Sequence, residues 1–185
     1  MVRQGVAGLL ALLLGLLLPG VVETAVPVRP TDYDVKAAFL YNFAKFVKWP
    51  DEGALGPTFV VAVLGDDPFG DVLDRTFAGK TILNRTVEVQ RISTLDPNAP
   101  TQILFVASSE KPRLPQVLKA LEGTNVLTVG EMDGFADRGG MIAFRMKEDT
   151  VHFDINLERV ERAGLKMSSQ LIRLALRVIS GKDGE

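Results

Sequence analysis

Paired acids and paired hydroxyls follow two predicted buried strands in this sequence. Asp66 and Asp67 come at the end of the run TFVVAVLG, and Ser108 and Ser109 come directly after QILFVA. In open α/β sheets, ligands bind outside the carboxyl ends of the strands. These four side chains are therefore the first candidates for a polar crevice that binds a ligand or a partner.

The two acids have two other interpretations. Either Asp66 or Asp67 can serve as the N-cap of a following helix, with Pro68 in its first turn. Paired carboxylates at this place also hold magnesium in response-regulator receivers. That interpretation is disfavoured because the third buried strand ends in Val-Gly-Glu, where a receiver has a lysine.

Trp49 and His152 are two further candidates for contact with a ligand or partner. Trp49 stands alone before Pro50, and His152 is the single histidine, on a predicted strand where it shares a face with Asp154. A lone histidine does not form a multi-histidine metal site, and the chain has no cysteine. No nucleophile elbow or nucleotide-binding loop is recognisable, so we expect no catalytic residues, metal or cofactor, and a protein that is not an enzyme.

Composition points to one globular domain that does not bind nucleic acid. The chain has 185 residues, of which 46% are hydrophobic and 24% charged, with a net charge of −2. This length suits one domain of ordinary size. A nucleic-acid-binding domain usually carries an excess of basic residues, which is missing here.

The first 25 residues have the pattern of an export signal. Arg3 precedes the apolar run GVAGLLALLLGLLL, and Pro19-Gly20 follows the run and breaks its helix. The run is short for a membrane span. A retained N-terminal anchor is the alternative, because Glu23 is a poor residue near a cleavage site. We expect residues 1–25 to be a signal peptide, residues 31–180 to form the domain, and the protein to reside in the periplasm.

The remaining sequence alternates helices and strands. Thr31 and Asp34 have capping-box spacing at the start of a helix that Pro50 terminates, with Lys36, Lys45 and Lys48 expected along its rim. Further helices are expected over 66–79, 108–123, 157–164 and 168–181, strands over 58–65, 86–92, 102–107 and 125–130, and a hairpin over 141–156 that turns at Glu148-Asp149. Such alternation predicts an α/β fold: a single domain with a mixed, mostly parallel sheet, helices on both faces and an antiparallel hairpin at its edge.

Several segments together resemble the YfiR-like family of exported proteins. They are YDVKAAFLYNFAKFVKWP, VAVLGDDPFG, QILFVASSE and GGMIAFRMKEDTVHFDINLERVERAGLKMSSQLIRLA, in this order over about residues 32–178. The resemblance implies a periplasmic regulator that binds and represses a membrane-bound diguanylate cyclase and thereby controls cyclic-di-GMP and biofilm formation.

The same resemblance implies particular partners. They are the periplasmic part of the cyclase or a similar sensor, an outer-membrane lipoprotein that relieves repression, and a second copy of the chain in a homodimer. Without cysteine, the redox sensitivity of the best-known members does not carry over. The alternative function is a periplasmic module that binds a small ligand without catalysis.

Overall fold

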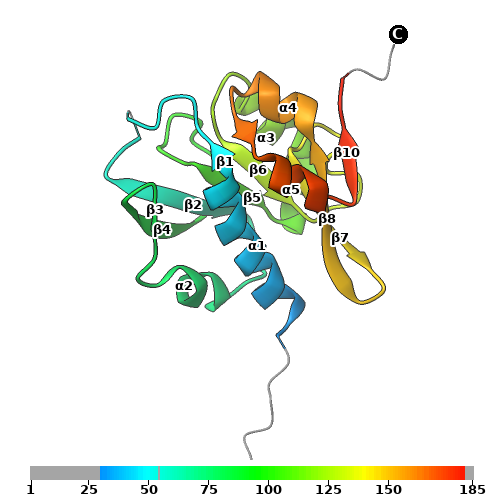
Figure 1. Cartoon of the computed structure of the whole chain (residues 1–185), viewed down its shortest axis with the longest axis horizontal. Coiled ribbons are helices and arrows are strands. Elements are labelled where there is room, and N and C mark those ends of the chain that lie inside the picture. The colour runs from blue at the N-terminus through cyan, green and yellow to red at the C-terminus, as the bar shows by residue number, and fades with distance from the viewer. Residues whose placement is uncertain (1–29, 54, 182–185) are drawn as a thin grey trace, which may run out of the picture.

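The computed structural model describes residues 30–53 and 55–181, which form a mixed sheet with helices on both faces (Figure 1). The proposed signal segment 1–25 lies outside the described residues. The helical elements are α1 (Asp32–Phe46), α2 (Val72–Phe77), the 3-10 helix η1 (Ser108–Arg113), α3 (Leu114–Ala120), α4 (Leu157–Arg162) and α5 (Ser169–Leu174). The strands are β1 (Val47–Lys48), β2 (Thr58–Leu64), β3 (Thr81–Ile82), β4 (Arg85–Ile92), β5 (Ile103–Val106), β6 (Leu127–Gly130), β7 (Ile142–Lys147), β8 (Thr150–Asn156), β9 (Lys166–Met167) and β10 (Arg177–Ile179).

The main sheet has the order β10-β8-β7-β6-β5-β2-β4-β3. Strands β4, β2, β5, β6 and β7 run parallel, whereas β3 pairs antiparallel with β4 and β8 antiparallel with β7. The hairpin turns at Glu148 and Asp149, both with positive φ, as the sequence predicts. The predicted α/β fold with a mostly parallel sheet is therefore confirmed.

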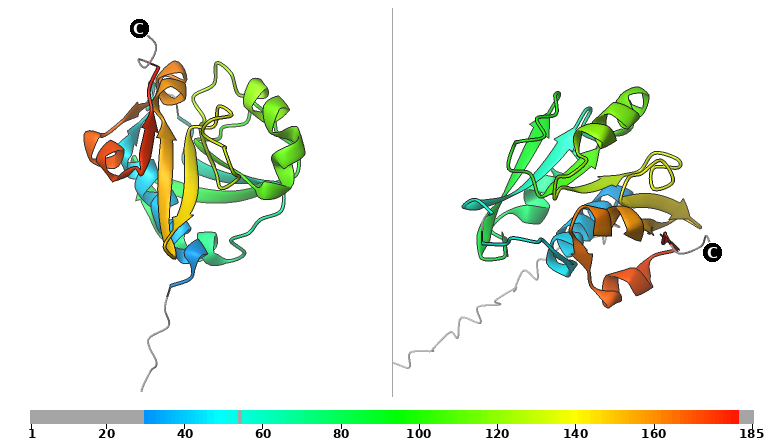
Figure 2. Two further views of the ribbon diagram at one scale, coloured as in Figure 1. Left: turned by 90° about the vertical axis from the view of Figure 1, so that its right-hand side faces the viewer. Right: turned by 90° about the horizontal axis from the view of Figure 1, so that it is seen from above.

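Each face of the sheet has its own hydrophobic core. On one face, Leu40 and Phe43 of α1 pack against Val61 and other residues of the central strands. On the other face, Leu114 of α3 belongs to a smaller cluster that includes Leu104 of β5. The turned views show α1 and α5 on one side of the sheet and α3 on the other (Figure 2). This arrangement fits the continuous apolar sequence of the central strands, which are buried on both faces.

Helix α1 begins with the predicted capping box. The Thr31 side chain accepts a hydrogen bond from the backbone N–H of Asp34, whose carboxylate accepts one from the N–H of Thr31. The helix ends at Phe46, earlier than the prediction that Pro50 terminates it. Val47 and Lys48 instead form β1, which pairs with β9 and ties this end of α1 to the segment before α5.

Two other predicted helices are wrong in extent. Residues 66–71 form turns, and α2 begins only at Val72. The helix predicted over 168–181 has the expected N-cap, Ser168, but ends at Leu174. The chain then becomes β10, which lies parallel to β8 and pairs with its last three residues, Asp154 to Asn156. The part of β8 toward the hairpin tip therefore remains an edge. Among the described residues, no helix is both long enough and apolar enough to cross a membrane.

Candidate functional site at the carboxyl ends of the strands

The turns that follow β2, β5 and β6 meet at the end of the molecule where α1 begins. The backbone N–H of Asp66 donates a hydrogen bond of 2.9 Å to Ser109 Oγ, which joins the first two turns. Gly65 makes this close approach possible. Its φ is +90°, and a Cβ there would lie 2.5 Å from Ser109 Oγ. Two of the predicted site residues are therefore in direct contact.

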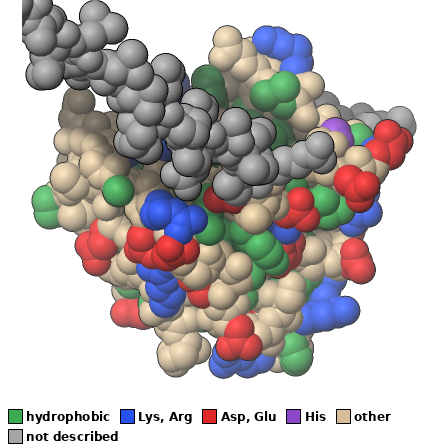
Figure 3. Space-filling model, turned by 90° about the horizontal axis from the view of Figure 1, so that it is seen from below, with side chains coloured by type: hydrophobic (Ala, Val, Ile, Leu, Met, Phe, Trp, Pro, Cys, Tyr) green, Lys and Arg blue, Asp and Glu red, His purple; other side chains and the backbone are tan. Residues whose placement is uncertain are grey.

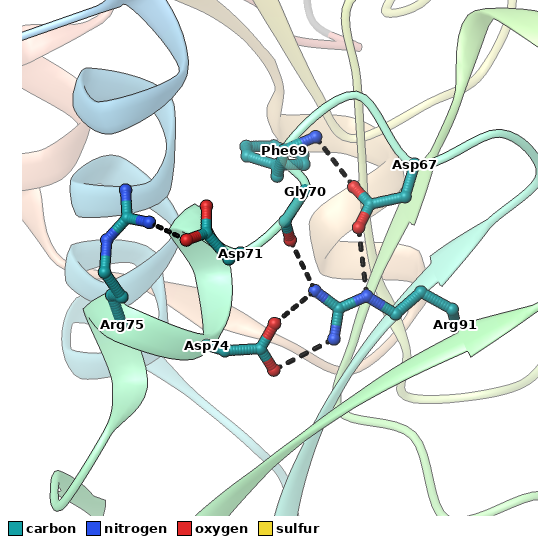
Figure 4. Close-up of polar contacts among 7 residues, drawn as sticks. All are labelled: Asp67, Phe69, Gly70, Asp71, Asp74, Arg75 and Arg91. Atoms are coloured by element: carbon teal, nitrogen blue, oxygen red, sulfur yellow. Dashed lines mark hydrogen bonds and ion pairs between the residues drawn. The ribbon is translucent and has the colours of Figure 1, made fainter.

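Asp67 is held by an arginine from the neighbouring strand (Figure 4). Arg91 donates from Nε to Asp67 Oδ2 at 2.9 Å, and its two terminal nitrogens donate to both carboxylate oxygens of Asp74 at 2.9 and 2.5 Å. The carbonyl oxygen of Gly70 accepts a further bond of 2.7 Å from the same guanidinium. These hydrogen bonds from Arg91 hold the pKa of Asp74 below its usual value, and the Asp74 carboxylate in turn raises the pKa of Arg91.

This cluster corrects the interpretation of the two acids as helix caps. Asp67 Oδ1 accepts from the backbone N–H of Phe69 at 2.8 Å, which closes a turn before the helix. The residue at the N-cap position of α2 is Asp71, whose side chain makes no capping bond. Asp67 therefore shapes the turn and binds Arg91, an arrangement that uses both of its oxygens.

A second cluster joins α1 to the turn after β6. Lys36 Nζ donates to Glu131 Oε2 at 2.6 Å, and the Tyr33 hydroxyl donates to Glu131 Oε1 at 3.1 Å. The Lys36 ammonium also lies 4.3 Å from the centre of the Tyr33 ring. Burial, together with the negative charge of Glu131, raises the pKa of Tyr33 to about 12. The prediction that Lys36 lies on the rim is wrong, because this side chain is buried and ion-paired.

A polar pocket of about 370 Å³ opens beside this second cluster, where β7 extends beyond the end of β6. Its lining residues come from α1, η1, the turn after β6, and β7: Lys36, Ser108, Glu131, Asp133, Phe144, Arg145 and Met146. Seen from this end, the molecule presents acidic, basic and apolar side chains in a mixed pattern (Figure 3). The predicted residue Ser108 thus lines a pocket, but a different one from the contact between Asp66 and Ser109.

The other two predicted site residues lie elsewhere. Trp49 is buried, with its ring edge-to-face on Phe59 at 5.2 Å between centroids, near the amino end of β2. His152 lies on β8, opposite Arg145 and toward the hairpin tip, and is partly exposed. The structure therefore brings Asp66, Asp67, Ser108 and Ser109 to one end of the sheet and places Trp49 in the core.

The arrangement is suited to binding and to holding elements together. Within residues 30–53 and 55–181, no group of three or more His, Asp or Glu side chains is placed to hold a metal ion. The charged groups at this end are instead joined in ion pairs, foremost those of Lys36 and Arg91.

Sequence reasoning missed Lys36, Glu131 and Arg91 as members of this site. Glu131 had a usable signal, because it directly follows a buried strand, as Asp66 follows another. Arg91 had no such signal, because it lies within a predicted strand of alternating polar and apolar residues, where a charged residue is ordinary. Lys36 resembles the other lysines of its helix, and only the contact between α1 and the turn after β6 distinguishes it.

These features define a single α/β domain with polar clusters at the carboxyl ends of its strands. The family model described as YfiR/HmsC-like matches residues 33–176, which is most of the chain. The chain belongs to the YfiR/HmsC-like family, which confirms the resemblance found in the sequence.

Proposed function

We propose that the protein is a periplasmic regulator that binds the periplasmic part of a membrane-bound diguanylate cyclase and represses it. The observation that carries the proposal is membership of the YfiR/HmsC-like family, which supports a role in the regulation of diguanylate cyclase signalling. The function requires a binding surface and no catalysis. On this proposal an outer-membrane lipoprotein relieves repression, and the active form is a homodimer.

Three exposed apolar side chains near β8 are candidate contacts for such a partner. Met146 on β7, Leu174 at the end of α5 and Leu176 before β10 are 49%, 66% and 45% exposed. Their segments flank β8, since the N–H of Leu176 donates to the carbonyl of Phe153 and Met146 pairs across the hairpin with Val151. Large apolar side chains exposed to solvent are candidates for contact with another protein.

The experiment is deletion and complementation in the native host. Loss of the protein is expected to raise cellular cyclic-di-GMP, and the wild-type gene is expected to lower it again. The variant Leu174→Glu, with Leu176→Glu, should fold normally and fail to complement, because charged groups would face the partner. Phe46→Glu changes another exposed apolar residue, which lies at the far end of α1, and serves as the matched control.

The outcomes separate two parts of the proposal. Unchanged cyclic-di-GMP after deletion, together with no binding to any cyclase periplasmic domain of the host, would overturn the function. Full complementation by the doubly charged variant would leave the function in place and overturn the assignment of this surface.

A further inference from the structure

A pocket of about 320 Å³ lies at the amino ends of β6 and β7, at the opposite end of these strands from the ionic clusters. Its lining comes from the end of α3, the segments before β6 and β7, and α4. The volume falls within the ~300–1,000 Å³ that is usual for ligand pockets. The pocket is therefore large enough for a small organic molecule.

Hydrogen bonds hold the segments that line this pocket in place. The Asn125 side chain donates from Nδ2 to the carbonyl oxygen of Ala163 at 2.7 Å, which joins the segment before β6 to the end of α4. The N–H of Met141 donates to Thr128 Oγ1 at 3.1 Å, which joins β6 to the segment before β7. Ligand sites are usually formed before the ligand arrives, and this pocket meets that condition.

The guanidinium of Arg159 lies between two other lining residues of the pocket, Glu122 and Gly139. Its Nη1 is 3.9 Å from Glu122 Oε1. A Cβ at Gly139 would lie 2.9 Å from Nη2 and 3.2 Å from Nε. Gly139 has a φ of +101°, so a glycine suits this position and also leaves room for the guanidinium. Both sides of the guanidinium thus lie against residues of the pocket lining.

The N–H groups of Arg159 lack acceptors. The distance of 3.9 Å to Glu122 is too long for a hydrogen bond, and the guanidinium donates none to the residues that the structure describes. Arg91 has the same side-chain exposure, 35%, yet it donates to Asp67, to both oxygens of Asp74 and to a backbone carbonyl. A guanidinium has five N–H donors, so Arg159 can bind an acceptor from a ligand.

The charges of the lining favour an anionic ligand. Arg159 and Arg162 are its two cations, and Glu122 is its one acid. Arg162 is mostly exposed and pairs with Glu158 of its own helix, so Arg159 supplies the available positive charge. The Glu122 side chain is 62% exposed, so solvent screens its charge. A carboxylate matches a guanidinium in shape, because the two can form a pair of parallel hydrogen bonds.

We propose that this pocket binds a small aliphatic carboxylate. Its carboxylate oxygens accept hydrogen bonds from the guanidinium of Arg159, and its hydrocarbon chain lies against Leu118, Leu121 and Met141, which are apolar residues of the lining. This site is independent of the proposed regulation of a cyclase, and it lies away from Met146, Leu174 and Leu176, none of which lines it.

Three probes of equal chain length test the proposal: hexanoate, hexan-1-ol and hexylamine. Each is titrated into the ¹⁵N-labelled protein, in the form in which cells accumulate it, and amide shifts are followed by NMR. Hexanoate is expected to give saturable shifts at Gly123, Thr124 and Gly139, and to bind at least about tenfold more tightly than the alcohol or the amine. Binding of the alcohol or the amine as tight as that of hexanoate, or no saturable shift with hexanoate, would overturn the proposal.

Two variants of the charged residues should act in opposite directions. Arg159→Gln removes the guanidinium and keeps the backbone bonds of α4, so hexanoate binding should weaken by about tenfold or more. Glu122→Gln removes the one acid of the lining and should tighten hexanoate binding. Arg75→Gln changes another ion-paired arginine, outside this pocket, and is the matched control that should change nothing. Equal hexanoate affinity in Arg159→Gln and wild type contradicts the assignment, whereas a general loss of structure would not produce opposite changes.

Discussion

Two ionic clusters at the same end of the sheet have similar geometry and different surroundings. Arg91 and Asp74 meet at 2.5 Å with side chains 35% and 53% exposed, whereas Lys36 and Glu131 meet at 2.6 Å with side chains 8% and 15% exposed. Because the first pair is exposed to water, its ion pair adds little to the stability of the fold compared with two separately hydrated charges. In the second pair, both charges are largely shielded from water, so each one depends mainly on the other for its stabilisation. Similar distances therefore imply different contributions to stability.

The largest expected effect comes from removing one member of the buried pair. Lys36→Met or Glu131→Gln should each lower the free energy of unfolding by about 3 kcal/mol, because the remaining partner stays buried without its counter-charge or full hydrogen bonding. Urea unfolding of the folded variants measures this. The double variant Lys36→Met with Glu131→Leu should recover most of the loss. A loss of less than ~1 kcal/mol for both single variants would remove the distinction between the clusters.

The alkaline stability of the protein should depend on Tyr33. The folded-state pKa of Tyr33 is about 12, against an ordinary value of 10.0, so its contribution is complete below pH 10 and is lost as the pH rises through 12. Wild-type protein should therefore lose stability over this window, and Tyr33→Phe should lose less. Urea midpoints measured from about pH 9 to the alkaline limit of reversible unfolding test this. Parallel curves for the two proteins would contradict the raised pKa of Tyr33.

The exposed cluster should respond weakly. Arg91→Gln is expected to lower the free energy of unfolding by about 1 kcal/mol or less, and added salt should reduce the difference from wild type. Chemical unfolding at low and high salt tests both statements. A loss of ~3 kcal/mol, the size expected for a buried pair, would mean that Arg91 organises the turn after β2 to an extent that its exposure does not indicate.

The smallest effect is expected in acid, at Asp74. Its pKa is lowered by hydrogen bonds from Arg91, so its contribution is present above the ordinary value of 3.8 and is lost as the pH falls through the lowered folded-state pKa. Asp74→Asn should therefore slightly flatten the acid limb of the stability profile. The pKa of Asp74, followed by side-chain carboxyl NMR, should return toward 3.8 in Arg91→Gln. No change in that pKa would contradict the ion pair.

Local signals in the sequence predicted much of the fold. The spacing of Thr31 and Asp34 predicted the capping box, and Glu148-Asp149 predicted the hairpin turn. The apolar runs predicted the central strands because these strands are buried on both faces, which leaves a continuous pattern in the sequence. The rule that ligand sites lie at the carboxyl ends of strands also predicted that Asp66 and Ser109 lie close together, and a hydrogen bond joins them.

Features set by tertiary contacts were not predictable. Residues 177–179 have a helix-compatible pattern after α5, but pairing with β8 makes them a strand. As a lysine on an amphipathic helix, Lys36 was expected on the rim. Only the position of Glu131, in the turn after β6, explains why Lys36 is buried. Glu110 is likewise buried beside Gly65, a contact that no residue spacing indicates.

Our main proposal is that this protein represses a membrane-bound diguanylate cyclase from the periplasmic side. The decisive measurement is cyclic-di-GMP synthesis by a host cyclase, reconstituted so that its periplasmic domain is accessible, with the purified protein added in increasing amounts. We expect a saturable fall in synthesis with wild type and a much weaker fall with the Leu174→Glu, Leu176→Glu variant. Synthesis that stays constant with wild-type protein for every cyclase of the host would contradict the proposal.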